Sequence, residues 1–130
     1  MSDREKLPKT RTGLTHKFAI TWKNEATEKV ETSEYYITAN TYPDGRLGEV
    51  FIKPAQRNDE MVDQWSRAIS VMVQRGTDTQ ELVNLFAYTQ FMPAGMTDDL
   101  EVKTCSSIVD FVVRWLDLKF GEKAVASGHV

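Results

Sequence analysis

The side chains best suited to bind a ligand lie around the start of an apolar segment in the C-terminal third of the chain. Thr104, Ser106 and Ser107 supply hydroxyl groups just before that segment, and Phe91 supplies an aromatic plane in the preceding loop. A helix that begins here would point its free N–H groups and the positive end of its dipole at an anion. The sequence therefore predicts a site for an anionic, nucleotide-type small molecule at these residues.

Arg114 is the predicted cation of this site, and Arg67 is the alternative. Arg114 would lie roughly 11 Å along the helix axis from Ser107, at about 1.5 Å per residue, which suits an extended ligand better than a single phosphate. Two other interpretations stay open. Ser and Thr hydroxyls also cap helices, and Arg114 can instead pair with Asp110, at the i, i+4 spacing, or with Asp117.

Cysteine and histidine are too few to indicate a metal site or a nucleophilic site. The chain has one cysteine, Cys105, and two histidines, His16 and His129. One thiol forms no internal disulfide, and three such residues do not complete a structural zinc site. We interpret Cys105 as a buried structural thiol and His16, on the apolar phase of a strand, as a packed residue. We therefore predict no metal, no cofactor and no catalytic site.

The composition is typical of one ordinary domain. The chain has 130 residues, 41% hydrophobic and 27% charged, which suffices for a core and is too apolar for disorder. A formal charge of −3 argues against nucleic acid as a partner. No secretion signal and no apolar run of about 18 residues occurs, so we expect a cytoplasmic protein that does not enter a membrane.

The N-terminal half predicts β-structure. Residues 35–52 contain two runs rich in Tyr, Ile, Thr, Val and Phe, joined by Pro43, Asp44 and Gly45. Proline presets φ for a turn and glycine supplies a positive φ, so this stretch predicts a hairpin. Upstream, apolar residues alternate over 14–22, which indicates a first strand with one solvated face. The polar residues 23–34 are expected to form an exposed connection.

The C-terminal half predicts helices. Residues 61–73 are apolar at helical spacing, with Asn58 or Asp59 as the expected N-cap and Gly76 after the end. A shorter helix opens near Asp78, and residues 88–99 are expected to form a loop. The last helix is predicted over about 106–120, and apolar residues cover well over half of its circumference.

These elements predict an α+β domain, a three-stranded antiparallel β-meander followed by two to three helices packed on the sheet. We expect residues 1–12 to be a flexible basic tail, 13–120 to form the domain and 121–130 to be a second flexible tail. The last helix carries more apolar surface than three strands can cover. We therefore expect a homo-oligomer, most simply a C2 dimer that buries Trp115.

Short motifs along the chain match the pattern of a known domain. They are Arg11–Thr15, Tyr35–Asn40, Asp44–Ile52, Ala68–Ser70 with Arg75–Gly76, and Cys105 before the last helix. On these motifs the chain resembles the TSCPD domain, from about Arg11 to Leu118. That domain occurs near the C-terminus of ribonucleotide reductase large subunits, especially cobalamin-dependent ones, and as stand-alone proteins.

The namesake Thr-Ser-Cys-Pro-Asp motif is altered in this chain. It reads Lys103-Thr104-Cys105-Ser106-Ser107, so only the cysteine stays in place. In the family, the aspartate would bring a negative charge to the free N–H groups of the helix. Because Ser107 replaces it, we expect those groups to accept an external anion such as a phosphate.

The resemblance implies a non-catalytic, nucleotide-related binding module, with a ribonucleotide reductase large subunit as a candidate partner. It does not imply reductase chemistry, because radical ribonucleotide reduction uses several cysteines in a large barrel and this chain has one cysteine. The alternative function is a stand-alone phage-type sponge that sequesters a cyclic nucleotide or an ADP-ribose-derived immune signal. That alternative rests on size and outline, without a shared motif.

Overall fold

The computed structural model describes residues 3–56 and 58–122, which form a mixed α/β fold. In chain order the elements are β1 (Thr12–Lys23), β2 (Val30–Thr41), β3 (Leu47–Pro54), α1 (Glu60–Gln74), α2 (Thr79–Phe86), β4 (Gly95–Thr97), β5 (Thr104–Cys105) and α3 (Ile108–Phe120).

One antiparallel sheet contains all five strands, in the order β3-β2-β1-β4-β5. The predicted meander of β1, β2 and β3 is present, but the predicted total of three strands is wrong. β4 and β5 extend the sheet beyond β1 and are only three and two residues long. Strands this short have no room for an alternating polar and apolar pattern, so the sequence gives no sign of them.

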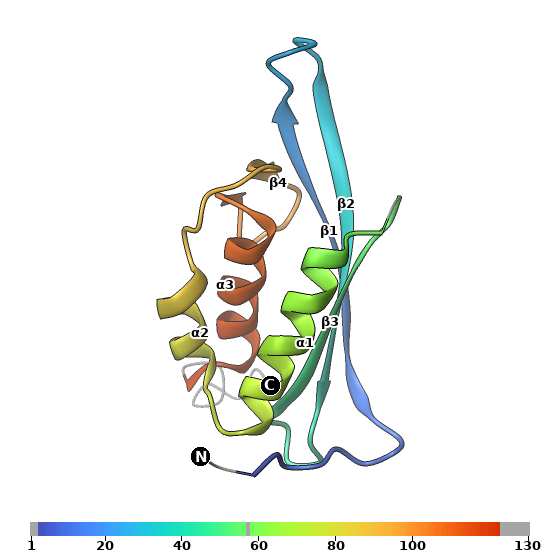
Figure 1. Ribbon diagram of the computed structural model, residues 1–130, viewed down its shortest axis with the longest axis vertical. Helices are drawn as coiled ribbons and strands as arrows, with labels where there is room; N and C mark the ends of the chain where they lie inside the picture. Colours follow the sequence, from blue (N-terminus) through green and yellow to red (C-terminus); the bar gives the residue numbers. More distant parts are fainter. Residues whose placement is uncertain (1–2, 57, 123–130) are drawn as a thin grey trace.

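The β2–β3 connection is the predicted turn. The amide of Gly45 donates to the carbonyl of Tyr42, and Tyr42 N donates to Arg46 O. Gly45 has φ +95°, in the left-handed region that glycine adopts without steric cost. Since β2 already begins at Val30, residues 30–34 belong to the strand and not to the expected exposed connection. The β1–β2 ribbon consequently extends past the helices (Figure 1).

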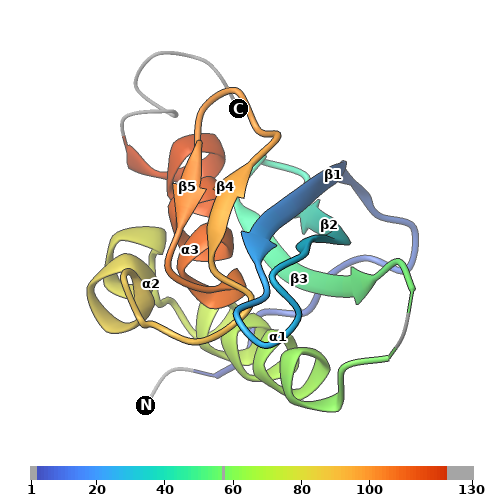
Figure 2. The ribbon, with the colours of Figure 1, turned by 90° about the horizontal axis from the view of Figure 1, so that it is seen from above.

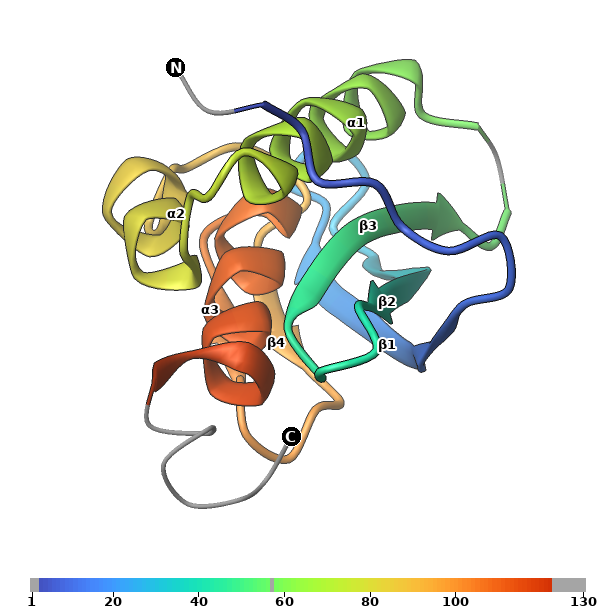
Figure 3. The same cartoon turned by 90° about the horizontal axis from the view of Figure 1, so that it is seen from below.

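The helices lie on one face of the sheet, and the sheet curls around α3 (Figures 2 and 3). α1 runs beside the edge strand β3 and has the predicted caps. Asp59 accepts a hydrogen bond from Val62 N, and Gly76, with φ +106°, follows the last turn. Asp78 is the N-cap of α2 and accepts a hydrogen bond from Glu81 N, and α2 packs beside α3.

Most of the apolar surface of α3 is covered within the single chain, whereas Leu118, near its end, is 45% exposed. Trp115 is 2% exposed, and the ring of Phe111 stacks on Phe18 of β1 with centroids 3.8 Å apart. The curled sheet and α2 surround the helix, so Trp115 does not form the dimer contact that we expected from the sequence. Homo-oligomerisation stays a prediction, and the buried side chain of Trp115 no longer supports it.

Ser70 attaches α1 to the sheet edge. Its hydroxyl accepts a hydrogen bond from Val50 N at 2.8 Å and lies 3.0 Å from Val50 O and 2.8 Å from Ser66 O. Val50 N points away from β2, because Val50 and Ala39 form a non-hydrogen-bonded pair of the ladder. The buried serine therefore satisfies a donor that an edge strand would otherwise show to solvent.

We predict that Ser70→Ala lowers the free energy of unfolding by about 1–3 kcal/mol, because it leaves the buried Val50 N–H without an acceptor. Urea unfolding measures this change. Thr10→Ala removes an exposed hydroxyl and is the matched control, with no measurable effect expected. Equal stability of the Ser70→Ala variant and the wild type would contradict the role of Ser70 at the sheet edge.

Candidate functional site

The predicted anion site at the start of α3 contains a carboxylate of the chain itself. Ser107 is the N-cap, and its hydroxyl accepts from Asp110 N at 3.1 Å. Asp110, 0% exposed, accepts from Ser106 N and from Tyr88 N at 2.8 and 2.7 Å. An external anion would have to displace this buried carboxylate from the helix start.

Arg114 is the counter-ion of Asp110. Its Nε and one terminal nitrogen bind the two carboxylate oxygens at 3.0 and 2.8 Å, and that terminal nitrogen also donates to Thr104 O at 2.5 Å. The guanidinium carbon lies 5.5 Å from the centroid of the Tyr88 ring. The interpretation of Arg114 as an ion-pair partner of Asp110, left open by the sequence, is confirmed.

The pKa of Asp110 is lowered in spite of its burial. Burial raises the pKa, and the hydrogen bonds from Arg114, Ser106 N and Tyr88 N lower it further than burial raises it. Asp110 thus supplies the negative charge that Ser107 lacks, three residues further along the chain. The serine followed three residues later by an acidic residue, together with the i, i+4 arginine, was the signal for this arrangement.

The structure brings five of the six predicted site residues together. Phe91 N donates to Ser106 O at 3.1 Å, which places the loop beside Thr104, Ser106, Ser107 and Arg114, and Phe91 is 41% exposed. Arg67 is not among these contacts. It lies on α1 and pairs with Asp63 at 3.3 Å.

Cys105 and His16, whose side chains could act as nucleophile or base, pack against the rest of the domain. Cys105 is buried, as predicted, and burial raises the pKa of its thiol. His16 stacks on Trp115 with ring centroids 5.1 Å apart, and its Nε2 lies 2.7 Å from Asp99 Oδ1, which confirms a packed histidine. Across residues 3–56 and 58–122, no His, Cys, Asp and Glu side chains gather as a metal site. In the same residues no helix is long and apolar enough to span a membrane.

A second candidate site, which the sequence did not indicate, lies beside the N-terminal segment, residues 3–11. This segment is attached to the domain, although we expected a flexible tail there. Glu5 N donates to Gln74 O at 2.9 Å, and Glu5 O accepts from the Tyr42 hydroxyl at 2.8 Å. Leu7 covers Gly48 so closely that a Cβ there would lie 2.5 Å from a Leu7 methyl carbon.

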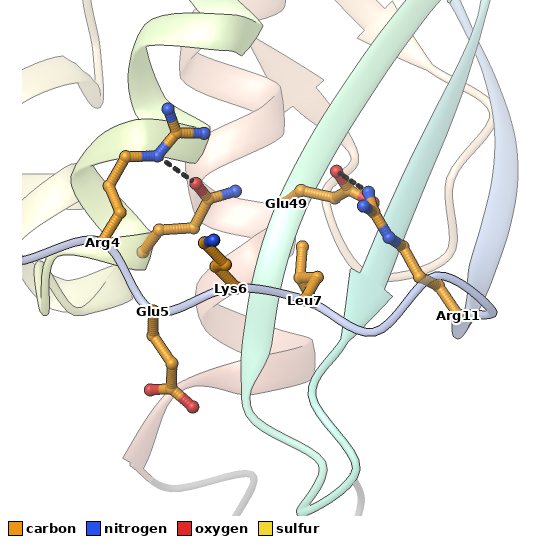
Figure 4. A pocket seen from close by; sticks show the side chains of 7 residues that line it. Arg4, Glu5, Lys6, Leu7, Arg11 and Glu49 are labelled. Carbon is orange, nitrogen blue, oxygen red and sulfur yellow. Dashed lines mark hydrogen bonds and ion pairs between the residues drawn. The ribbon is translucent and has the colours of Figure 1, made fainter.

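Between this segment, β3 and α1 lies a hollow of about 450 Å³ (Figure 4). Its lining residues are Arg4, Glu5, Lys6, Leu7, Arg11, Glu49 and Gln74. Glu49 is buried, accepts from Arg11 at 2.7 and 2.6 Å with its two oxygens, and accepts from Asn40 at 2.9 Å. This pairing joins the N-terminal segment to the sheet.

The family model of the TSCPD domain matches residues 5–120. The chain belongs to the TSCPD domain family. The match includes most of the N-terminal segment and all eight elements of the fold. No solved structure shows significant similarity to the chain.

Curated relatives of this TSCPD domain are named vitamin B12-dependent ribonucleotide reductases. The protein from Streptomyces coelicolor is 42% identical over 120 residues, and the one from Rhodopirellula baltica is 37% identical over 120 residues. Each alignment covers 90% of this chain and 11% of the relative. The Agrobacterium fabrum protein is 34% identical, with 91% of this chain and 9% of the relative covered. The chain therefore spans about a tenth of the length of these relatives.

We predict that Asp110→Asn lowers the free energy of unfolding by about 3–5 kcal/mol at pH 7, because it breaks a buried ion pair and leaves Arg114 without its counter-ion. Since the folded pKa of Asp110 is lowered, its carboxylate stabilises the fold above the unfolded-state pKa of about 3.9. That contribution is lost as the pH falls through the folded pKa.

Urea unfolding from pH 7 down to pH 3 tests this expectation. The difference between wild type and Asp110→Asn should shrink below about pH 4, whereas Asp3→Asn, on an exposed residue, should cause no difference at any pH. A difference in the free energy of unfolding that does not change with pH would contradict the role of an ionised Asp110. Arg114→Ala should also lower Tm, in contrast to the small change expected for a ligand-binding arginine.

We also predict that Cys105 resists iodoacetamide in the folded protein, because its thiol is buried and its pKa is raised. Mass spectrometry should show little alkylation under native conditions at pH 8 and complete alkylation in urea. Rapid native alkylation would show instead that Cys105 is accessible and reactive.

Proposed function

We propose that this TSCPD domain is a non-catalytic binding module that associates with the large chain of a ribonucleotide reductase. The observation that carries the proposal is the extent of the similarity. A region with the whole of this fold makes up about a tenth of each reductase relative. A domain of that kind, present as part of a larger enzyme, is expected to have a surface that contacts the rest of that enzyme.

The environment of Cys105 supports the non-catalytic part of the proposal. A redox-active cysteine needs an accessible thiolate, and Cys105 is 7% exposed with a raised pKa. Among the residues that the structure describes, His16 is the histidine, and it contacts Asp99 through Nε2 and stacks on Trp115. These contacts stabilise the core and do not activate a nucleophile.

The segment from the end of α2 into the loop before β4 is the surface that we expect to dock on the partner. Leu85, Tyr88, Phe91 and Met92 are 60%, 72%, 41% and 60% exposed along this one segment. Figure 1 shows it at the outer side of α2 and along the chain that leads to β4. Tyrosine, phenylalanine and methionine are enriched at protein interfaces.

The Asp110–Arg114 pair holds this surface in position. Tyr88 has φ +63°, an uncommon conformation for a residue with a side chain. Its amide donates to Asp110, and its ring lies under the Arg114 guanidinium. The contacts that fill the start of α3 therefore also fix an exposed aromatic ring, which favours a role in supporting an interface.

We also propose that the domain binds a nucleotide-type ligand, at a place other than the start of α3. At the start of α3, Asp110 already accepts the hydrogen bonds that a phosphate would take. The phage-type sponge, our alternative from the sequence, stays a prediction that no contact in the described residues favours.

The test uses a vitamin B12-dependent ribonucleotide reductase chain that lacks its own TSCPD region, immobilised for biolayer interferometry. We predict that the wild-type domain binds this chain and that Tyr88→Ala combined with Met92→Ala weakens binding by roughly tenfold or more, as for central interface residues. Met61→Ala, which truncates a 79% exposed side chain on α1, is the control and should change little.

Two outcomes would contradict this function. One is the absence of binding to the reductase chain at tens of micromolar. The other is release of a stoichiometric cyclic nucleotide or ADP-ribose derivative from the purified domain on denaturation, detected by mass spectrometry, which would favour the sponge.

A further inference from the structure

The hollow beside the N-terminal segment collects positive charge. Arg4, Lys6 and Arg11 line it, and Glu49 is the one buried carboxylate among the lining residues. Figure 4 shows Arg4 and Lys6 on the same side of the extended segment and Glu5 on the opposite side. Glu5 is bound there by Arg46 at 2.8 Å, so its charge is compensated outside the hollow.

The two arginines are held by their Nε atoms, which leaves terminal nitrogens for a ligand. Arg4 donates through Nε to Gln74 at 2.8 Å, and Gln74 is itself fixed by a bond to Gly48 O at 2.9 Å. Arg11 donates through Nε to Pro8 O at 2.8 Å and through one terminal nitrogen to Glu49.

Unused donors therefore remain around the hollow. Among the hydrogen bonds of the described residues, both terminal nitrogens of Arg4, the second terminal nitrogen of Arg11 and the Lys6 ammonium have no acceptor. Guanidinium groups bind phosphate oxygens through paired N–H donors, and the ammonium adds a point charge. Because the guanidinium groups are already oriented, little side-chain entropy would be lost on binding.

We propose that this hollow binds the phosphate groups of a small anionic molecule. Its volume of about 450 Å³ is within the usual range of small-molecule sites. None of its seven lining residues is aromatic, so the recognised chemistry is phosphate and not a stacked base.

The hollow is a candidate location for the nucleotide-type ligand of the proposed function. This inference rests on that ligand and not on docking to a reductase chain. It shares no residue with the segment 85–92, so docking on a reductase chain does not depend on it. The two proposals can fail separately, because phosphate binding is measured without any reductase chain.

The probe is inorganic triphosphate, titrated into the full chain by isothermal titration calorimetry at constant ionic strength. We expect saturable binding at one site. Arg4→Gln combined with Lys6→Gln should weaken it roughly tenfold or more, because hydrogen bonds to charged groups are removed. Adenosine triphosphate, as a second probe, should lose affinity by a similar factor in the same variant.

Lys9→Gln is the matched control, since it removes a positive charge from the same segment at a residue that does not line the hollow. It should retain binding within about twofold, because exposed charges act weakly at a distance in salt. Thermal unfolding of each variant confirms that the fold persists. As an independent measurement, triphosphate should shift the NMR signals of the Gln74 side-chain amide.

Three results would overturn the proposal. They are the absence of triphosphate binding up to millimolar concentration, an equal loss of affinity in Lys9→Gln and in the double variant, and unchanged Gln74 signals at saturation.

Discussion

The buried carboxylate of Asp110 joins the start of α3 to the end of α2 and to Arg114. It accepts from Ser106 N just before α3 and from Tyr88 N after α2, and it pairs with Arg114 one turn further along its own helix. A carboxylate with no exposed surface is stable only when such partners surround it. The position of the loop between α2 and β4 therefore depends on a charge inside the domain.

The sheet supplies the complementary constraint. α3 has apolar residues on most sides, and a flat sheet covers only one side of a helix. The short strands β4 and β5 extend the sheet beyond β1, and the curled sheet then surrounds the helix together with α2 (Figures 2 and 3). At the other sheet edge, α1 satisfies the Val50 amide through Ser70. Both features help the single chain to bury its apolar residues.

Under the proposed function, this TSCPD domain contributes binding surfaces to a larger enzyme. The exposed segment 85–92 has the residue types of a protein interface, and the hollow near Arg4 and Lys6 has the charge for a phosphate. Among the described residues, the Cys105 thiol is buried and the His16 ring stacks on Trp115.

The sequence by itself determined the elements whose signals are local. The Gly45 turn, the Asp59 and Asp78 caps, the family motifs and the burial of Cys105 were predicted and are present. The sequence also grouped Thr104, Ser106, Ser107, Phe91 and Arg114 in one place.

Only the tertiary structure decided which group occupies the start of α3 and where unpaired positive side chains lie among the described residues. Asp110 fills the start of α3 because the chain after α2 returns to donate the Tyr88 amide, a contact between residues 22 positions apart in sequence. The segment 3–11 lies on the domain because Leu7, Arg11 and Glu5 find Gly48, Glu49 and Gln74 far along the chain. Contacts of this kind have no periodic signal, since they depend on how distant backbones approach one another.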